Sequence, residues 1–406
     1  MSNFDERDDL SRELRTRSHD VGGHPIGLDG VKRSARKIQR RRRIATGAVA
    51  AAVFVVAVPT ALAVTSGFNQ GTDPVSPPTP SVTESTAPRP EGPVRLTTKE
   101  LPRGEDPQLS YIIHATQELV TPDGTLPLPQ AYTMMTPFRD GWLALGSQSG
   151  DGLEALWLDA DLNVVRSRPT IGSTLAASDD GDQVAWTEAA PDSRKSKLVS
   201  APAQGGDPQS WQVPSNEEVI PVGFVGDGRV VFTDVVTSLN GITEPDGGIT
   251  ELDGFLHLAD ASETSGLVSG LTRFGSAKVC SGVMDPASST SEMLWETCAY
   301  KLGAFSPNGR YVIGTPSDAD ALGSPSVAVL DAQSGEVLVE FKPGRNDPIS
   351  MYQLAWEDDQ NIIAMTIAGT DVMMIRLTLG GETEQVGSTG ESTNMSVPFW
   401  FAETRR

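Results

Sequence analysis

The segment GAFSPNGRYVIG (residues 303–314) decides the fold of this chain. An apolar stretch ends at a Pro-Asn-Gly turn, and a second apolar stretch follows directly. Asn and Gly suit a tight hairpin turn because its backbone enters the region of positive φ. The segment therefore predicts two antiparallel strands joined by a short turn.

Four other segments follow the same plan, and glycine occupies the turn in three of them. They are MTPFRDGWLALG (135–146), LAASDDGDQVAW (175–186), VGFVGDGRVVFT (222–233) and LAWEDDQNIIAM (354–365), in which Gln360 replaces the glycine. A second hairpin follows most of these turns, within residues 155–167, 197–213, 255–269, 327–341 and 372–386. Two hairpins per unit make four antiparallel strands, so we expect an all-β protein built from repeated four-stranded sheets.

The spacing of the turns indicates a β-propeller. Turn positions 141, 181, 228, 309 and 360 are 40, 47, 81 and 51 residues apart, and units of about 40–50 residues are typical of blades. We interpret the long interval as one blade with an insertion. Strand-like residues 109–120 and 395–402 would pair to close the ring as a composite blade. We expect six blades, with seven as the alternative if residues 273–300 form a full sheet.

The two cysteines, Cys280 and Cys298, both fall within the long interval. An oxidising compartment outside the membrane favours a disulfide between them, with a free buried pair as the alternative. Two thiols without a neighbouring histidine cannot supply the four ligands of a structural zinc site. Between the cysteines lie Met293, Leu294 and Trp295, an apolar group that is a candidate contact site for a partner. Packing on a blade face is the alternative reading of this group.

The N-terminal part of the chain predicts a membrane anchor. Basic residues crowd into 32–43, and the next 23 positions, 44–66, carry no charge. A helix of that length spans about 34 Å, enough to cross a hydrocarbon core, whereas the arginines resist crossing. We therefore expect a disordered cytoplasmic tail (1–43), one transmembrane helix (44–66), a Pro/Ser/Thr-rich linker (67–95) and an extracytoplasmic propeller (96–406). A signal peptide cleaved after Ala63 is the alternative.

One repeat is familiar. FSPNGRYVI (305–313) closely resembles the turn motif of TolB-like (WD40-like) propeller repeats, and SDDGDQVAW (178–186) is a weaker copy. The Trp-Asp dipeptide of WD40 repeats is missing. The resemblance spans roughly residues 109–402 and implies a propeller, but it carries no function or site residue, because such propellers serve many roles. The tail, arginine run, apolar helix and stalk also resemble single-pass proteins of high-GC Gram-positive bacteria.

Charge and motifs exclude several functions. The chain has 32 Lys+Arg against 53 Asp+Glu, and the acidic excess lies in the propeller, which would repel nucleic acid and anionic lipid. It lacks a Gly-x-Ser-x-Gly elbow, a His-Glu-x-x-His zinc motif and a phosphate-binding loop. Asp159-Ala-Asp161-Leu-Asn163 is similar to half a calcium loop, but Val164 stands where glycine is needed, which favours a hairpin turn. We expect no catalytic residue, metal site or cofactor.

Three functions remain. The first is a membrane-anchored, extracytoplasmic binding or scaffold module for an envelope protein, a peptide or a glycan. The second is a transmembrane signalling protein whose N-terminal tail contacts a cytoplasmic regulator such as a sigma factor. The third is a secreted or anchored hydrolase or lyase that works through carboxylates. The absence of catalytic motifs favours the first.

Overall fold

The computed structural model describes most of the C-terminal part of the chain. The described residues are 90–147, 152–189, 196–203, 206–215, 218–234, 236–275, 279–288, 292–319, 323–344, 347, 349–392 and 397–402. The predicted tail, transmembrane helix and nearly all of the linker lie outside these ranges. Within them, no helix is long and apolar enough to cross a membrane.

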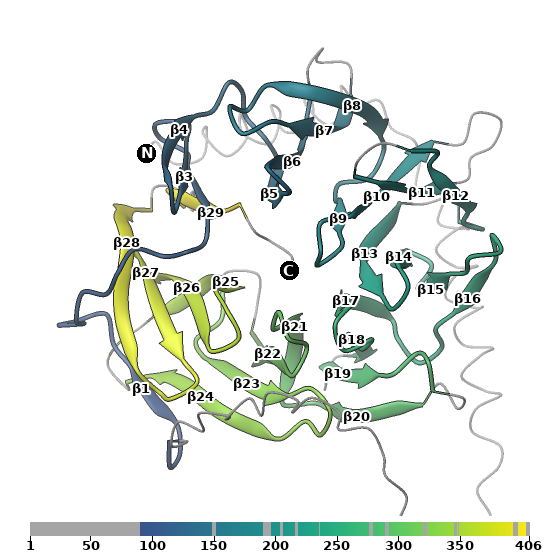
Figure 1. Ribbon diagram of the computed structural model, residues 1–406. Coiled ribbons are helices and arrows are strands. Elements are labelled where there is room, and N and C mark those ends of the chain that lie inside the picture. Colours follow the sequence, from purple (N-terminus) through teal and green to yellow (C-terminus); the bar gives the residue numbers. More distant parts are fainter. Residues whose placement is uncertain are drawn as a thin grey trace, which may run out of the picture. The chain divides into compact units, whose positions relative to one another are not determined.

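Seven sheets surround a common centre, so the domain is a seven-bladed β-propeller (Figure 1). Blade 1 contains β29 (Phe399–Phe401), β2 (Tyr111–Ile113), β3 (Glu118–Thr121) and β4 (Gly124–Pro127). Blade 2 contains β5 (Met134–Phe138), β6 (Gly141–Gly146), β7 (Leu153–Leu158) and β8 (Val164–Thr170). Blade 3 contains β9 (Ala176–Ala177), β10 (Gln183–Ala189), β11 (Ser196–Pro202) and β12 (Gln209–Gln212). Blade 4 contains β13 (Val219–Val225), β14 (Arg229–Asp234), β15 (Asn240–Thr243) and β16 (Ile249–Glu251).

Blades 5 to 7 complete the ring. Blade 5 contains β17 (His257–Ala261), β18 (Val268–Phe274), β19 (Val279–Met284) and β20 (Met293–Thr297). Blade 6 contains β21 (Tyr300–Phe305), β22 (Tyr311–Pro316), β23 (Val327–Asp331), β24 (Val337–Pro343) and, as a fifth strand, β1 (Val94–Leu96). Blade 7 contains β25 (Ser350–Trp356), β26 (Asn361–Ala368), β27 (Asp371–Thr378) and β28 (Thr383–Glu391). First strands such as β5, β9 and β21 lie nearest the centre, and last strands such as β8, β16 and β20 lie at the periphery (Figure 1).

The expectation of six blades is wrong and the alternative number of seven is confirmed, although residues 273–300 supply two complete strands, β19 and β20, and not a full sheet. The interval between Gly228 and Gly309 contains two blades, because β14 pairs with β15 and β15 with β16 in a hairpin that the sequence analysis overlooked. Residues 255–269 therefore begin blade 5 instead of completing blade 4. The cysteine-containing segment supplies β19 and β20 of that blade, so it is a regular part of a sheet and not an insertion.

The ring closes as the sequence predicted. Strand β29 pairs antiparallel with β2, with Phe401 opposite Tyr111 and Phe399 opposite Ile113. The rings of Tyr111 and Phe399 also meet edge to face, with centroids 6.0 Å apart. Strands from the two ends of the propeller thus form one sheet, which removes the unpaired edges that an open ring would leave.

The core is divided into seven layers, each between two neighbouring blades. Large aromatic side chains fill these layers: Trp157 of blade 2 meets Trp186 of blade 3 with ring centroids 5.6 Å apart. Trp356 of blade 7 stacks on Tyr311 of blade 6. Every blade therefore buries both of its faces, which explains why the inner strands read as nearly continuous apolar runs.

Before it enters blade 1, the chain crosses the outer edges of blades 6 and 7; we call residues 90–108 the strap. Strand β1 pairs in parallel with β24, with Val94 opposite Phe341. Leu96, the last residue of β1, is fully buried. Further along, the strap meets β28: Gly104 N donates to Gln385 O at 2.9 Å, and Gln385 N donates to Pro102 O at 2.9 Å. The strap thus covers two sheet edges, and β1 spans the predicted boundary between linker and propeller.

Candidate functional site

Three hollows of the propeller open on one face. Neighbouring strands are antiparallel, so the turn after the first strand of a blade and the turn after its third strand emerge on the same side. We call this side the turn face. Three hollows are lined mainly by residues of these turns, and two of the three adjoin one another.

The two adjoining hollows share Gln108 of the strap and Glu357 of blade 7, and we call them together the strap groove. One part, of about 540 Å³, lies between the strap and blade 7. The other, of about 640 Å³, extends over the turns of blades 1 and 2. The groove therefore follows the face across three consecutive blades.

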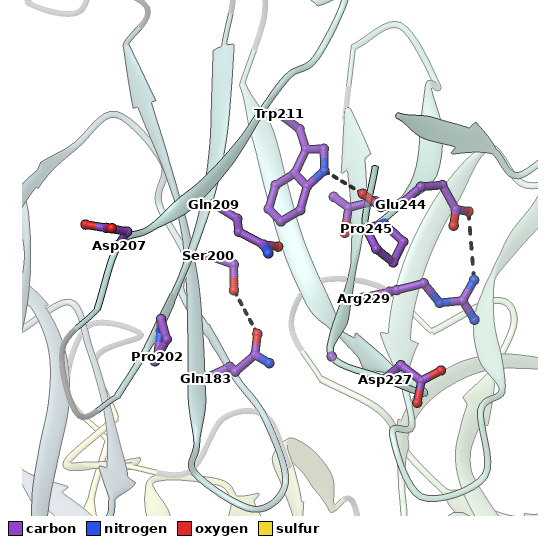
Figure 2. A pocket seen from close by; sticks show the side chains of 12 residues that line it. Gln183, Ser200, Pro202, Asp207, Gln209, Trp211, Asp227, Arg229, Glu244 and Pro245 are labelled. Carbon is purple, nitrogen blue, oxygen red and sulfur yellow. Dashed lines mark hydrogen bonds and ion pairs between the residues drawn. The ribbon is translucent and has the colours of Figure 1, made fainter. Parts of the chain in front are cut away.

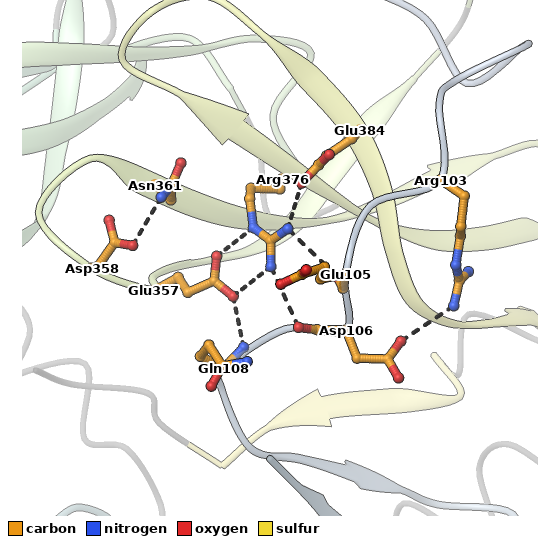
Figure 3. A network of polar contacts seen from close by, with 9 residues as sticks. All are labelled: Arg103, Glu105, Asp106, Gln108, Glu357, Asp358, Asn361, Arg376 and Glu384. Atoms are coloured by element: carbon orange, nitrogen blue, oxygen red, sulfur yellow. Dashed lines mark hydrogen bonds and ion pairs between the residues drawn. The ribbon is translucent and has the colours of Figure 1, made fainter.

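An arginine on β27 holds the floor of the first part (Figure 3). Arg376 donates from Nε to Glu357 Oε2 at 2.5 Å and from Nη2 to Glu357 Oε1 at 2.8 Å, and from Nη1 to Glu384. The side chains of Arg376 and Glu357 are only 11% and 3% exposed. The hydrogen bonds to Glu357 raise the pKa of Arg376 above its ordinary value, so the guanidinium stays charged.

The same Arg376 cluster (Arg376, Glu357 and Glu384) fastens the strap. Gln108 N donates to Glu357 Oε1 at 2.7 Å, and Arg376 Nη1 lies 3.4 Å from the carbonyl oxygen of Glu105. Gly104 lies so close to the carboxylate of Glu384 that any side chain there would collide with it. The one cation and the two anions of the cluster are therefore occupied in holding the fold, and a ligand must use the other groups of the groove.

Those other groups differ between the two parts of the groove. In the first part, Glu105, Asp106 and Glu382 are exposed. The second part is lined by Trp142 together with apolar side chains of the neighbouring turns: Leu109, Pro122, Leu126 and Pro137. One part of the groove is thus acidic, and the other combines these apolar side chains with exposed charged ones, among them Asp123, Arg139 and Asp140.

The third hollow is a smaller pocket of about 200 Å³ between blades 3 and 4 (Figure 2). Trp211 forms one wall and donates from Nε1 to the carbonyl oxygen of Glu244 at 3.1 Å. On the same blade, Ser200 Oγ donates to Gln183 Oε1 at 3.2 Å. Its size suits one small polar group more than a polymer segment.

Nearer the centre of the face, turns of separate blades contact each other. Asp179 N of blade 3 donates to Glu263 Oε2 of blade 5 at 2.9 Å, and Thr264 Oγ1 donates to Pro307 O of blade 6 at 3.1 Å. Burial raises the pKa of the Glu263 carboxyl, and the charges of Asp180 and Asp179 raise it further. These contacts join the inner turns on one side of the ring.

The predicted disulfide is present: Cys280 and Cys298 are joined, with their Cα atoms 4.0 Å apart. Because Ser281 lies opposite Thr297, the bond ties β19 to the end of β20 within blade 5. Within the described ranges, Cys280, Cys298 and the nearby Glu296 make up the only group of three potential metal ligands, and the disulfide uses both sulfurs.

The predicted contact group is divided by the pleat of β20. Leu294 is 41% exposed, whereas Met293 and Trp295 are half-buried. Trp295 Nε1 donates to the carbonyl oxygen of Ala332 at 2.8 Å, so this indole reaches the neighbouring blade 6. A role of these three residues in contacting a partner stays a prediction.

The DADLN segment forms the turn between β7 and β8. The Asp159 carboxylate accepts hydrogen bonds from Asp161 N at 3.0 Å and from Asn163 N at 2.8 Å. The hydrogen bond from the backbone of Asn163 lowers the pKa of Asp159, with help from the Asn163 side chain. Two oxygen-bearing residues of the calcium-like pattern therefore serve the hairpin turn.

Neither the strap groove nor the strap was predicted from the sequence. The groove unites the strap with turns about 250 residues further along the chain, such as the pair Gln108 and Glu357. The one signal available was the run of carboxylates in WEDD (356–359) and GGETE (380–384), which fall in turns of the same blade. Nothing in those runs points to the strap as their neighbour.

Comparison with known proteins finds similar solved structures but no related sequence. No protein-family model matches this chain, and no curated protein sequence matches it. Among solved structures, the propeller domain of the Trilobed protease from Pyrococcus furiosus is similar, with 10% identity, a TM-score of 0.45, and coverage of 63% of this chain and 84% of that one. Virginiamycin B lyase from Staphylococcus aureus has 15% identity, a TM-score of 0.43 and the same two coverages. A putative TolB from Agrobacterium tumefaciens has 18% identity, a TM-score of 0.36, and coverage of 56% and 86%.

Proposed function

We propose that this propeller is a binding module, held outside the cell membrane by residues 44–66, and that the strap groove is its ligand-binding site. The observation that carries the proposal is the groove itself: two adjoining hollows of about 540 and 640 Å³ along one face of a rigid ring. Propellers offer such faces to ligands, and hollows of this size hold groups as large as several residues of a polymer.

The construction of the groove supports this role. Its walls are turns fixed on seven packed sheets, and its floor is held by the buried ion pair between Arg376 and Glu357. A surface ordered before binding costs little conformational entropy when the ligand arrives. An extended segment of a peptide or a glycan suits a groove that crosses three blades.

Photocrosslinking in intact cells tests the site. A photoreactive phenylalanine analogue replaces Thr125, an exposed residue of the groove, in one version of the full chain, and Phe274, which is 71% exposed on blade 5, in another. We expect an adduct of defined mass at position 125 and none at position 274. Equal labelling at both positions, or none at position 125, would contradict the proposal. Protease added to the same cells should remove the propeller if it faces outward.

A further inference from the structure

We propose that the ligand of the strap groove is an extended, positively charged peptide that also carries an apolar side chain. This inference rests on the proposed function, because it names the class of ligand for the same groove.

The acidic part keeps unbalanced negative charge. The charge of Arg376 is matched within its own cluster by Glu357 and Glu384. Among the described residues, the carboxylates of Glu105 and Glu382 make no hydrogen bond or ion pair, and both side chains are exposed. Lysine or arginine side chains of a ligand would complement these free carboxylates, whereas an acidic ligand would be repelled.

The spacing of the carboxylates argues against a single metal ion as the ligand. In the described part of the chain, only the cysteine pair with Glu296 brings three potential ligand atoms within 4.8 Å of one another. The carboxylates of the strap groove therefore do not converge on one point. Separate cationic side chains along an extended backbone match separated carboxylates better than one compact cation does.

The second part of the groove explains the apolar side chain. Trp142, Pro137 and Leu126 line it, together with the exposed side chains of Asp123, Arg139 and Asp140, and this part adjoins the acidic part at Gln108 and Glu357. An aliphatic or aromatic side chain next to the basic residues of the ligand would move out of water and pack against the apolar side chains of this part. Exposed Gln108 and Thr125 lie along the same path and can hydrogen-bond to a peptide backbone.

A binding experiment with the full chain in detergent micelles tests the inference. The probe is a decapeptide of alternating lysine and threonine with one central leucine, carrying a neutral fluorophore and followed by anisotropy. Its controls are the same peptide with glutamine or glutamate in place of lysine. We expect the lysine peptide to bind at least about tenfold more tightly than the glutamine peptide at low salt, and its affinity to fall as salt rises.

Two double variants locate the interaction. Glu105→Gln with Glu382→Gln removes the two free carboxylates, and we expect about fivefold weaker binding of the lysine peptide, since each exposed charge pair contributes modestly. Glu251→Gln with Glu292→Gln removes the same charge from exposed positions of blades 4 and 5, and we expect less than a twofold change.

Each other result overturns the inference in a recognisable way. Equal losses in the two double variants would show that only net charge attracts the peptide. Equal binding of the glutamine peptide would refute the cationic class. Failure of all peptides to bind, with the adduct at position 125 retained, would overturn the peptide ligand and leave the proposed function standing. Loss of both signals would overturn both.

Discussion

Blades 5 and 6 are neighbours with the same four-stranded plan, yet their outer strands are secured differently. The outer strand of blade 6, β24, pairs with β1 of the strap, which comes from more than 240 residues earlier in the chain. The outer strand of blade 5, β20, is tied to β19 by the disulfide between Cys280 and Cys298. In blade 6 a distant segment covers the free edge of the last strand, whereas in blade 5 a covalent bond joins the last strand to its neighbour.

The two ties also differ in their position relative to the proposed binding groove. The strap continues from blade 6 to blade 7 and ends on the Arg376 cluster, so it forms one wall of the proposed binding groove. The disulfide acts within blade 5, in which the indole of Trp295 on β20 reaches blade 6. Losing the strap contacts should therefore affect both the stability of the propeller and the groove, whereas losing the disulfide should affect stability alone.

The largest effect should come from breaking the non-covalent tie. Replacing Arg376 by methionine leaves the buried carboxylate of Glu357 without its partner, which costs about 3–5 kcal/mol of unfolding free energy. Denaturant titration of the full chain measures this loss. Arg103→Met is the matched control, because its ion pair with Asp106 is exposed and contributes at most about 1 kcal/mol. Equal losses in the two variants would show that the cluster does not secure the strap.

The covalent tie comes next. The disulfide closes a loop with a sequence separation of 18, so replacing both Cys280 and Cys298 by alanine should cost about 3 kcal/mol. The same titration in the presence of a reductant provides the check: the reductant should destabilise the native chain and leave the double variant unchanged. Peptide binding at the strap groove should persist in this variant, because blade 5 does not line the groove.

A smaller effect concerns the indole of Trp295 on β20. Trp295→Phe removes the hydrogen bond from Nε1 to Ala332 O and should cost about 1 kcal/mol beyond the packing loss. Trp400→Phe on β29 supplies the comparison, because it loses a similar volume from another half-buried site. The difference between the two midpoints of thermal unfolding isolates the hydrogen bond. No difference would mean that Trp295 contributes only contact area.

The smallest effect is a pH dependence in the turn between β17 and β18 of blade 5. Because the folded pKa of Glu263 is raised, its contribution to stability is present below its ordinary pKa and is lost as the pH rises through the folded value. Glu263→Gln keeps an oxygen for Asp179 N and removes the charge. The melting temperature of the variant minus that of the native chain should therefore be higher at pH 7 than at pH 4. An unchanged difference in melting temperature between these two pH values would contradict the shift.

The hairpins could be predicted because their causes are local. Gly228 and Gly309 adopt φ of 71° and 68°, and the turn type follows from residues within a few positions of each. The closing pair β29 and β2 was also predictable, since two leftover apolar strands of a ring must meet. The hairpin of β15 and β16 was missed because NGITEPDGGITE (240–251) contains three glycines and a proline, with only two isoleucines to signal strands.

The sequence alone was enough to predict the all-β class, most of the hairpins, the closure of the ring and the cysteine pairing, because each depends on backbone turns, alternating apolar residues or the only two thiols present. The tertiary structure decided the number of blades, the path of the strap and the groove. These depend on which sheet edges and which buried charges remain unpaired once the blades have packed, as for Arg376 and the Glu105 carbonyl, 271 positions apart in the chain. Such pairings form only between residues that the packing of the blades brings together, so they cannot be predicted from any short stretch of sequence.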